Sequence, residues 1–301
     1  MDFGFYPEAF CMSDGPIQIR TLEGLERKKE KVSQGRSVQK DWIYSPSLTK
    51  RIFSLPKTHS IGHAEGNDEA RLRFLIQCFG FFAGMRMTET EAGFLDATPL
   101  QRCKLTDFFM IDKDISKAMI KADDFWDDYK KFPEIEKSMR ACIHNFFLAK
   151  IPNLLDFEMF NYLYFTFDAC HFVNSKIKNV CPIKARHGDR IHNLCEQFEI
   201  KTPDWAIRPS ERADPYITTQ RNRIAHEGVF SGEPLGFALL ADAPDGTSGG
   251  EMLRQMQSLA CRLMIALLGM KDNDYVRSSV IIPGIFSLDL SAAPQATTTA
   301  S

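Results

Sequence analysis

The chain has 301 residues and a formal net charge of −2, which argues against a broadly basic nucleic-acid-binding surface, so any RNA contact must come from a local patch. Hydrophobic residues make up 44% of the chain and Phe occurs 24 times, which is enough apolar material for one large domain or two small ones. Eight Cys residues without a CxxC pair or a regular spacing favour reduced, mostly buried thiols over a disulfide framework or a zinc site.

Two features of the sequence bear on location. Residues 1–15 lack the basic start and apolar run of a signal peptide. The longest apolar-rich run, 74–85, is interrupted by Gln77 and is too short to span a membrane. We therefore expect a cytoplasmic protein that does not contact a membrane.

Residues 1–64 are predicted to be irregular with a bias towards short strands. Apolar residues occur there in short runs between Gly and Pro, at Phe3, Phe5, Ile17, Ile19 and 42–44. The charged stretch 25–32 is compatible with either a short helix or a solvated loop. His59 and His63 have the spacing of two metal ligands on a helix, but the Ser, Gly and Pro residues around them favour a loop without metal.

Helical periodicity dominates the rest of the chain. Helices are expected to begin near Asp68, near Lys113, at Pro133 and after Gly250, and to cover 156–174 and 186–199. The aromatic helix 156–174 is expected at the centre of one antiparallel bundle formed by residues 113–270. Short strands are expected at 280–282 and 285–288, where they can pair with the N-terminal strands.

Two polar groupings on these helices are ambiguous. Four acids at 123, 124, 127 and 128 are interpreted as a solvated face and not as a divalent-metal site. Glu158, Asn161 and Asp168 form a polar stripe, for which a solvent-facing position is favoured over a supporting catalytic role. The predicted fold is mainly α, with a β-leaning region 1–64, a helical domain 65–290 and a disordered, low-complexity tail 291–301.

Residues 214–228 have the pattern of a short helix with both ends marked. Asp214 can serve as the N-cap with Pro215 at the first helical position, and Gly228 occupies a C-cap position. Arg221 lies four residues after Ile217, on the inward side of this helix. A guanidinium in that position needs an anionic partner or a wet cleft.

His226 follows Arg221 by five residues, about 140° further around the helix axis. The two side chains can still reach one cleft, because arginine is long and His226 lies in the last turn. Asn222 precedes His226 by four residues and is its neighbour on the helix surface. The alternative interpretation is structural, with Arg221 paired to a core acid and His226 capping the helix.

The segment Arg-Asn-Arg-Ile-Ala-His at 221–226 resembles the Arg-Asn-x-x-x-His signature of the HEPN superfamily, and with Glu-Gly after it is most similar to the ApeA-like branch. The resemblance is specific over 214–228 and architectural over 113–270. It implies an antiparallel HEPN-type helical bundle. Many members are metal-independent ribonucleases, whereas others only bind nucleotides or partners.

By resemblance, two such motifs meet across a homodimer and form one composite cleft. Arg221 would hold the scissile phosphate, His226 would move protons, and Asn222 would orient His226 or the phosphate. Attack by the ribose 2′-OH on single-stranded RNA would leave a 2′,3′-cyclic phosphate without a metal or cofactor. Host defence or toxin-like growth arrest is the implied role. In part of the family a Tyr two residues after the His is the target of a nucleotidyltransferase antitoxin, and Gly228 stands there instead.

Candidate RNA-binding residues lie in the most basic short segment, 176–192, where five Lys or Arg stand against one Asp. They are Lys184, Arg186 and Arg190, together with Arg223 in the motif. A solvated loop is an equally good interpretation of that segment. The competing function is a non-catalytic HEPN module that binds a nucleotide, RNA or a protein partner, which the near-neutral net charge favours.

Overall fold

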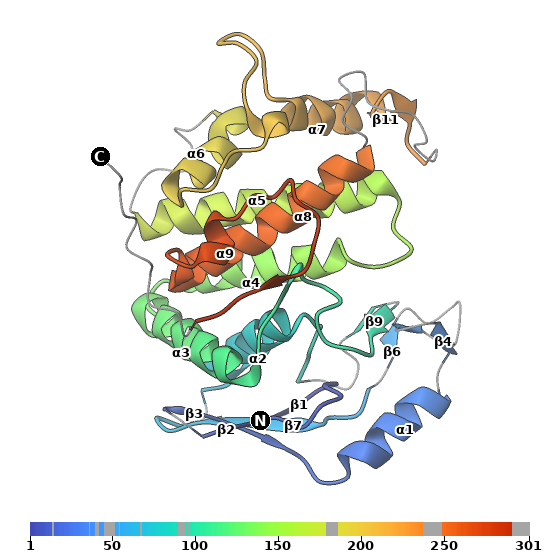
Figure 1. The fold of residues 1–301 in the computed structure, drawn as a ribbon, viewed down its shortest axis with the longest axis vertical. Helices are drawn as coiled ribbons and strands as arrows, with labels where there is room; N and C mark the ends of the chain where they lie inside the picture. The colour runs from blue at the N-terminus through green and yellow to red at the C-terminus, as the bar shows by residue number, and fades with distance from the viewer. Residues whose placement is uncertain are drawn as a thin grey trace. The chain divides into compact units, whose positions relative to one another are not determined.

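The computed structural model describes residues 1–290 except 14, 36, 40–41, 45–51, 54, 67, 90–93, 96, 179–185 and 237–248. The protein is mainly helical, with a small antiparallel sheet near the N-terminus and further short strands (Figure 1). Over these described ranges, every helix is too short or too polar to cross a membrane. Its contacts divide the chain into two compact units, one of residues 1–128, 268–275 and 285–301, the other of 129–267 and 276–284.

The helices follow the predicted order along the chain. They are α1 (Leu25–Gly35), α2 (Glu69–Ala83), α3 (Asp112–Tyr129), α4 (Pro133–Leu148), α5 (Asp156–Ile177), α6 (Arg190–Gln197), α7 (Tyr216–Glu227), α8 (Gly249–Ile265) and α9 (Asp274–Arg277). Short 3₁₀ turns η2 (His187–Asp189) and η3 (Asp204–Ala206) lie before α6 and between α6 and α7. The predicted helix 186–199 is therefore a 3₁₀ turn followed by an α-helix.

The first unit contains an antiparallel sheet of order β1-β7-β3-β2, formed by Asp2–Phe3, His59–His63, Ile17–Thr21 and Cys11–Met12. Ile19 pairs with Ile61, and both side chains are buried on the face that α2 covers (Figure 1). His59 and His63 lie on β7 and not in the predicted loop. Their side chains are buried because the alternation of a strand directs residues 59, 61 and 63 to one face.

The remaining short strands of the first unit are peripheral to this sheet. They are β4 (Ser37–Gln39), β5 (Trp42–Tyr44) and β9 (Ala97–Pro99) in one sheet, β6 (Ile52–Phe53) with β8 (Phe94–Leu95), and β10 (Phe108–Phe109) with β13 (Phe286–Ser287). The C-terminal strand β13 pairs with β10 in parallel. The prediction that it pairs with the N-terminal strands is therefore wrong. Residues 280–282 form no strand, because Arg254 of α8 donates to the carbonyls of Val280 and Ile281.

A buried charged cluster joins α2, α3 and β7 in the first unit. Arg71 Nε donates to Asp123 Oδ1 at 2.7 Å, and a second nitrogen of Arg71 lies 2.9 Å from Asp127 Oδ2. His63 Nε2 lies 3.0 Å from Asp123 Oδ2, while the amide of Glu65 donates to His63 Nδ1. Asp123 is only 3% exposed, so the prediction of a solvated acid face is wrong at this residue. Its burial is possible because Arg71 neutralises the carboxylate and His63 forms a hydrogen bond with it.

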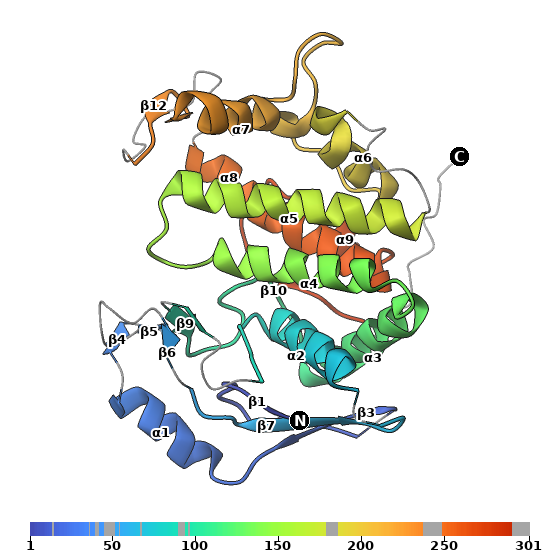
Figure 2. The same cartoon turned by 180° about the vertical axis from the view of Figure 1, so that it is seen from behind.

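The second unit is built on α5, which packs against α4 and α8 on one side and against α6 and α7 on the other (Figure 2). Its buried side chains include Phe160, Leu163 and Phe167. α5 thus has the central position predicted for the aromatic helix 156–174. α3, which was expected in the same bundle, belongs to the first unit by its contacts. The predicted domain boundary after residue 64 stays a prediction, and the tail 291–301 lies outside the described residues.

Candidate functional site

Helix α7 carries the motif, and its ends are set by local sequence. Pro215 precedes the helix in an extended conformation, and Gly228 ends it at φ 66°, where its N–H donates to the carbonyl of Arg223. Asp214 does not cap the helix, contrary to the prediction. Its carboxylate instead accepts a hydrogen bond from Arg208 Nη1 at 3.2 Å.

The inward face of α7 is formed by Ile217, Thr218 and Gln220, which are buried. Gln220 Oε1 accepts the amide of Ser231 at 2.9 Å and so anchors the hairpin of β11 (Val229–Phe230) and β12 (Glu233–Pro234) to the helix. Arg221 follows Gln220 and is half-buried. The motif therefore begins at the border between the core and the solvent.

The structure brings Arg221 and Asn222 together. Arg221 Nη1 donates to Asn222 Oδ1 at 3.1 Å. Over the part of the chain that the structure describes, no carboxylate forms an ion pair with Arg221. His226 is exposed in the last turn, and within the same part of the chain it makes no hydrogen bond or ion pair. A single chain therefore does not join Arg221 to His226.

Tyr164 of α5 contacts η2, and it lies near enough to Thr218 and Arg221 of α7 for both to affect its pKa. Its hydroxyl lies 2.7 Å from His187 Nδ1, and the two rings stack with centroids 5.6 Å apart and an interplanar angle of 7°. Burial raises the pKa of Tyr164 to about 12, and the charge of Asp168 acts in the same direction. A hydrogen bond from Thr218 and the charges of Arg221 and Arg190 oppose that increase.

Asp168 of α5 continues the network on the other side of the imidazole. Its Oδ2 lies 3.6 Å from His187 Nε2, and its Oδ1 accepts from Arg190 Nη1 at 3.0 Å. Burial lowers the pKa of His187 below its usual value. The carboxylates of Asp168 and Asp214 act against this shift, whereas the cations Arg190 and Arg221 add to it. Burial and the two cations therefore favour the neutral form of the His187 imidazole.

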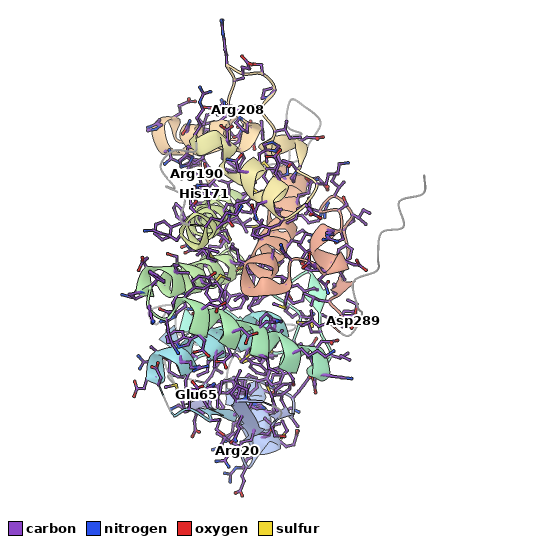
Figure 3. The ribbon with its side chains drawn as sticks, turned by 90° about the vertical axis from the view of Figure 1, so that its left-hand side faces the viewer. Arg20, Glu65, His171, Arg190, Arg208 and Asp289 are labelled. Carbon is purple, nitrogen blue, oxygen red and sulfur yellow. The ribbon has the colours of Figure 1, made fainter. Side chains whose placement is uncertain are left out.

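Gly188 fixes η2 against the start of α7. A Cβ at this residue would lie 2.9 Å from Pro215 Cδ, so only glycine permits this approach without a shift. Arg208 strengthens the junction because it hydrogen-bonds both Asp189 of η2 and Asp214 before α7. Figure 3 labels Arg208 and Arg190, the two arginines that bind the acids of this corner. Together these contacts hold His187 beside Tyr164.

The candidate RNA-binding residues have different surroundings. Lys184 lies outside the described residues, and Arg186 is exposed immediately before η2. Arg190 is bound to Asp168, and Arg223 Nε forms an i,i+4 ion pair with Glu227 at 3.3 Å. Only Arg186, among the three that the structure describes, is exposed and without an ion pair to an acid.

Sequence reasoning did not identify Tyr164 and His187 as site residues. Tyr164 and Asp168 are four residues apart on one helix, a spacing that puts both on the same face. That signal was available, but it became informative only with η2 folded against it. No group of three or more His, Cys, Asp or Glu side chains is arranged to hold a metal ion in the ranges that the structure describes.

The chain was compared with family models, with curated proteins and with solved structures. None of the three comparisons gives a match. The functional assignment therefore depends on the motif and on the geometry around it.

Proposed function

We propose that the chain is a HEPN-type endoribonuclease that cleaves single-stranded RNA without a metal, with Arg221 as its phosphate ligand. One observation carries the proposal. The guanidinium of Arg221 is half-buried and, over the described residues, has a neutral amide and no carboxylate as its hydrogen-bond partner. An arginine that is oriented by an amide and not neutralised by a carboxylate can bind a phosphate through paired N–H donors.

The residues of α7 have the chemistry that metal-free cleavage requires. A neutral His226 takes the proton of the ribose 2′-OH, the 2′-oxygen bonds to phosphorus, and the bond to the 5′-oxygen breaks. A protonated imidazole supplies the proton that the 5′-oxygen needs, and a 2′,3′-cyclic phosphate remains. Arg221 stabilises the charge that develops on the phosphoryl oxygens. Asn222 orients the guanidinium through its hydrogen bond.

A homodimer would supply the second histidine. His226 is exposed at the end of α7, where a second copy of the chain can approach it. Two copies related by a two-fold axis would place the same helix against itself and so put two Arg–His motifs in one cleft. A helical second unit centred on α5 is compatible with the HEPN bundle that this proposal assumes. Host defence or toxin-like growth arrest would be the cellular role.

The second candidate is a non-catalytic HEPN module that binds a nucleotide, RNA or a protein partner. The separation of the half-buried Arg221 from the exposed His226 within one chain favours it. Such a module would use Arg221 for a phosphate or an acidic side chain and would not need His226. The two candidates therefore differ in what His226 does.

The deciding experiment is cleavage of single-stranded RNA by the purified full chain in the presence of EDTA. We expect cleavage with a 2′,3′-cyclic phosphate product, and a loss of at least about 100-fold in both Arg221→Ala and His226→Ala. His192→Ala and Arg212→Ala are matched controls, because both side chains are partly or fully exposed and lie outside the motif.

The outcomes separate the two candidates. Full activity in His226→Ala removes the mechanism. Absence of cleavage together with nucleotide binding that Arg221→Ala abolishes favours the binding module. A cooperative loss of stability in Arg221→Ala, with RNA binding intact, supports the purely structural role of Arg221.

A further inference from the structure

The imidazole of His187 has an unusual set of neighbours for a histidine that only supports the fold. Its Nδ1 edge is saturated by the hydroxyl of Tyr164 at 2.7 Å. Its Nε2 edge faces Asp168 Oδ2 at 3.6 Å, which is too long for a hydrogen bond. The side chain as a whole is 37% exposed.

The neighbours also determine which nitrogen carries the proton. The hydroxyl of Tyr164 donates to Nδ1 of His187 when that nitrogen carries no proton. The carboxylate of Asp168 on the other side only accepts, which favours a proton on Nε2. His187 therefore carries its proton on Nε2, where Asp168 Oδ2 at 3.6 Å is too distant to accept a good hydrogen bond.

The charged groups that the structure describes near this N–H leave one cation, Arg221, available for an anion. Arg221 of α7 and Arg190 of α6 both act on His187, and both lower its pKa after the larger effect of burial. The acids that face it are Asp168 and Asp214, and each is bound by an arginine, Asp168 by Arg190 and Asp214 by Arg208. The guanidinium of Arg221 is the cation of this corner that no acid neutralises within the described residues.

We infer that His187 is a second phosphate-binding residue of the Arg221 site and that it donates its Nε2–H to a phosphate oxygen. This rests on the proposed function, because it takes the ligand of Arg221 to be the phosphate of a nucleotide or RNA. No proton is transferred in this step. The imidazole stays neutral, and its N–H exchanges water for an anionic acceptor. The corner formed by α5, η2 and α7 is thereby a phosphate site within one chain.

The alternative is that His187 only ties η2 to Tyr164. Two substitutions separate these roles, because an Asn amide occupies the place of Nδ1 and a Gln amide can reach the place of Nε2. His187→Asn keeps an acceptor for Tyr164 and loses the outer donor. His187→Gln keeps an outer donor and loses the acceptor. A structural role thus predicts that Asn is the milder change, and a phosphate role predicts that Gln is.

The test measures binding of uridine 3′-monophosphate to the full chain by titration calorimetry at pH 7.5, with thermal unfolding as the control for folding. We expect His187→Asn to weaken binding about tenfold or more, the range for a hydrogen bond to a charged group. His187→Gln should stay within about threefold of wild type, and His192→Gln should bind as wild type does. Equal affinities of the Asn and Gln variants, or weaker binding by Gln, would overturn the inference.

A second measurement uses the unmodified protein, so it does not depend on variants that fold. Nitrogen-15 NMR of the histidine rings should find His187 as the neutral Nε2–H form at pH 7.5, with its Nε2 signal shifted by the nucleotide. A nucleotide that binds without moving this signal, in a protein that still cleaves RNA through Arg221, removes the inference and leaves the proposed function standing. A nucleotide that shifts the His187 signal, in a protein that does not cleave RNA, supports phosphate binding by His187 and removes the ribonuclease function.

Discussion

The backbone of Gly188 lies against the ring of Pro215, so that a Cβ at residue 188 would stand 2.9 Å from Pro215 Cδ. The same Cβ would lie 3.1 Å from Arg208 Nη2 and 3.3 Å from Asp214 Oδ1. The proline ring is rigid, so it cannot move aside as a long side chain could. Any side chain at 188 therefore separates η2 from the start of α7.

The first prediction concerns this approach. Gly188→Ala should lower the free energy of unfolding by about 1–3 kcal/mol, the usual cost of overpacking. It should also weaken binding of uridine 3′-monophosphate, because His187 moves with η2. Gly250→Ala is the matched control, since nothing lies within 4 Å of its Cβ position in the first turn of α8. Urea unfolding of both variants tests this, and equal midpoints would contradict it.

The second prediction concerns the buried cluster of the first unit. Asp123→Ala should lower the free energy of unfolding by about 3–5 kcal/mol, because it leaves the buried side chains of Arg71 and His63 without their shared carboxylate. Asp124→Ala should change it by no more than about 0.5 kcal/mol, because that side chain is 59% exposed in a long contact with Lys121. Chemical denaturation compares the two, and a similar small effect in both would restore the solvated-face interpretation.

A third prediction concerns pH and His59. Burial lowers the pKa of His59 from 6.5 to about 4, in a site where its nitrogens contact the hydroxyls of Thr58 and Thr21. Between these pH values the unfolded chain takes up a proton that the native chain does not, so stability falls as the pH decreases. The contribution is about 3 kcal/mol across this window.

His59→Gln isolates that contribution, because an amide does not titrate. Its free energy of unfolding should vary less between pH 6.5 and 4.5 than that of wild type, by the amount that one proton accounts for. Parallel curves of wild type and variant over this range would show that His59 is not the group responsible.

The fourth prediction separates two arginines that the sequence grouped together. Arg186→Ala should weaken RNA binding and reduce the slope of log affinity against log salt by about one, because an exposed cation binds a phosphate. Arg190→Ala should reduce stability, because it removes the partner of Asp168. Arg212→Ala is the control for a surface charge. Filter binding at several salt concentrations measures the effect, and an unchanged slope in Arg186→Ala contradicts the assignment.

Most features specified by local sequence were predictable, although Asp214 does not cap α7 as expected. Pro133 begins α4, Asp68 caps α2, and Gly228 ends α7 because capping depends on a few neighbouring residues. The mainly helical fold and the central position of the aromatic helix follow likewise from periodicity. The roles of Arg221, Asn222 and His226 stay predictions.

Features that depend on distant contacts were not predictable. Asp123 is buried because of Arg71 and His63, which lie 52 and 60 residues away along the chain. Tyr164 meets His187 across 23 residues, through a turn whose position depends on a close approach at Gly188. A pattern of charges on one segment carries no information about such partners.

The pairing of β10 with β13 has a consequence for synthesis of the protein. The backbone amides of Phe286 and Leu288 donate to the backbone carbonyls of Asp107 and Phe109. The hydroxyl of Tyr275 donates to the side-chain carboxylate of Asp107. Phe286 and Leu288 emerge from the ribosome only after residues 129–267 and 276–284 of the second unit have been made. The first unit, although it is begun first, is therefore finished last, and a premature stop before residue 286 would leave Phe108 and Phe109 without the strand that pairs with them.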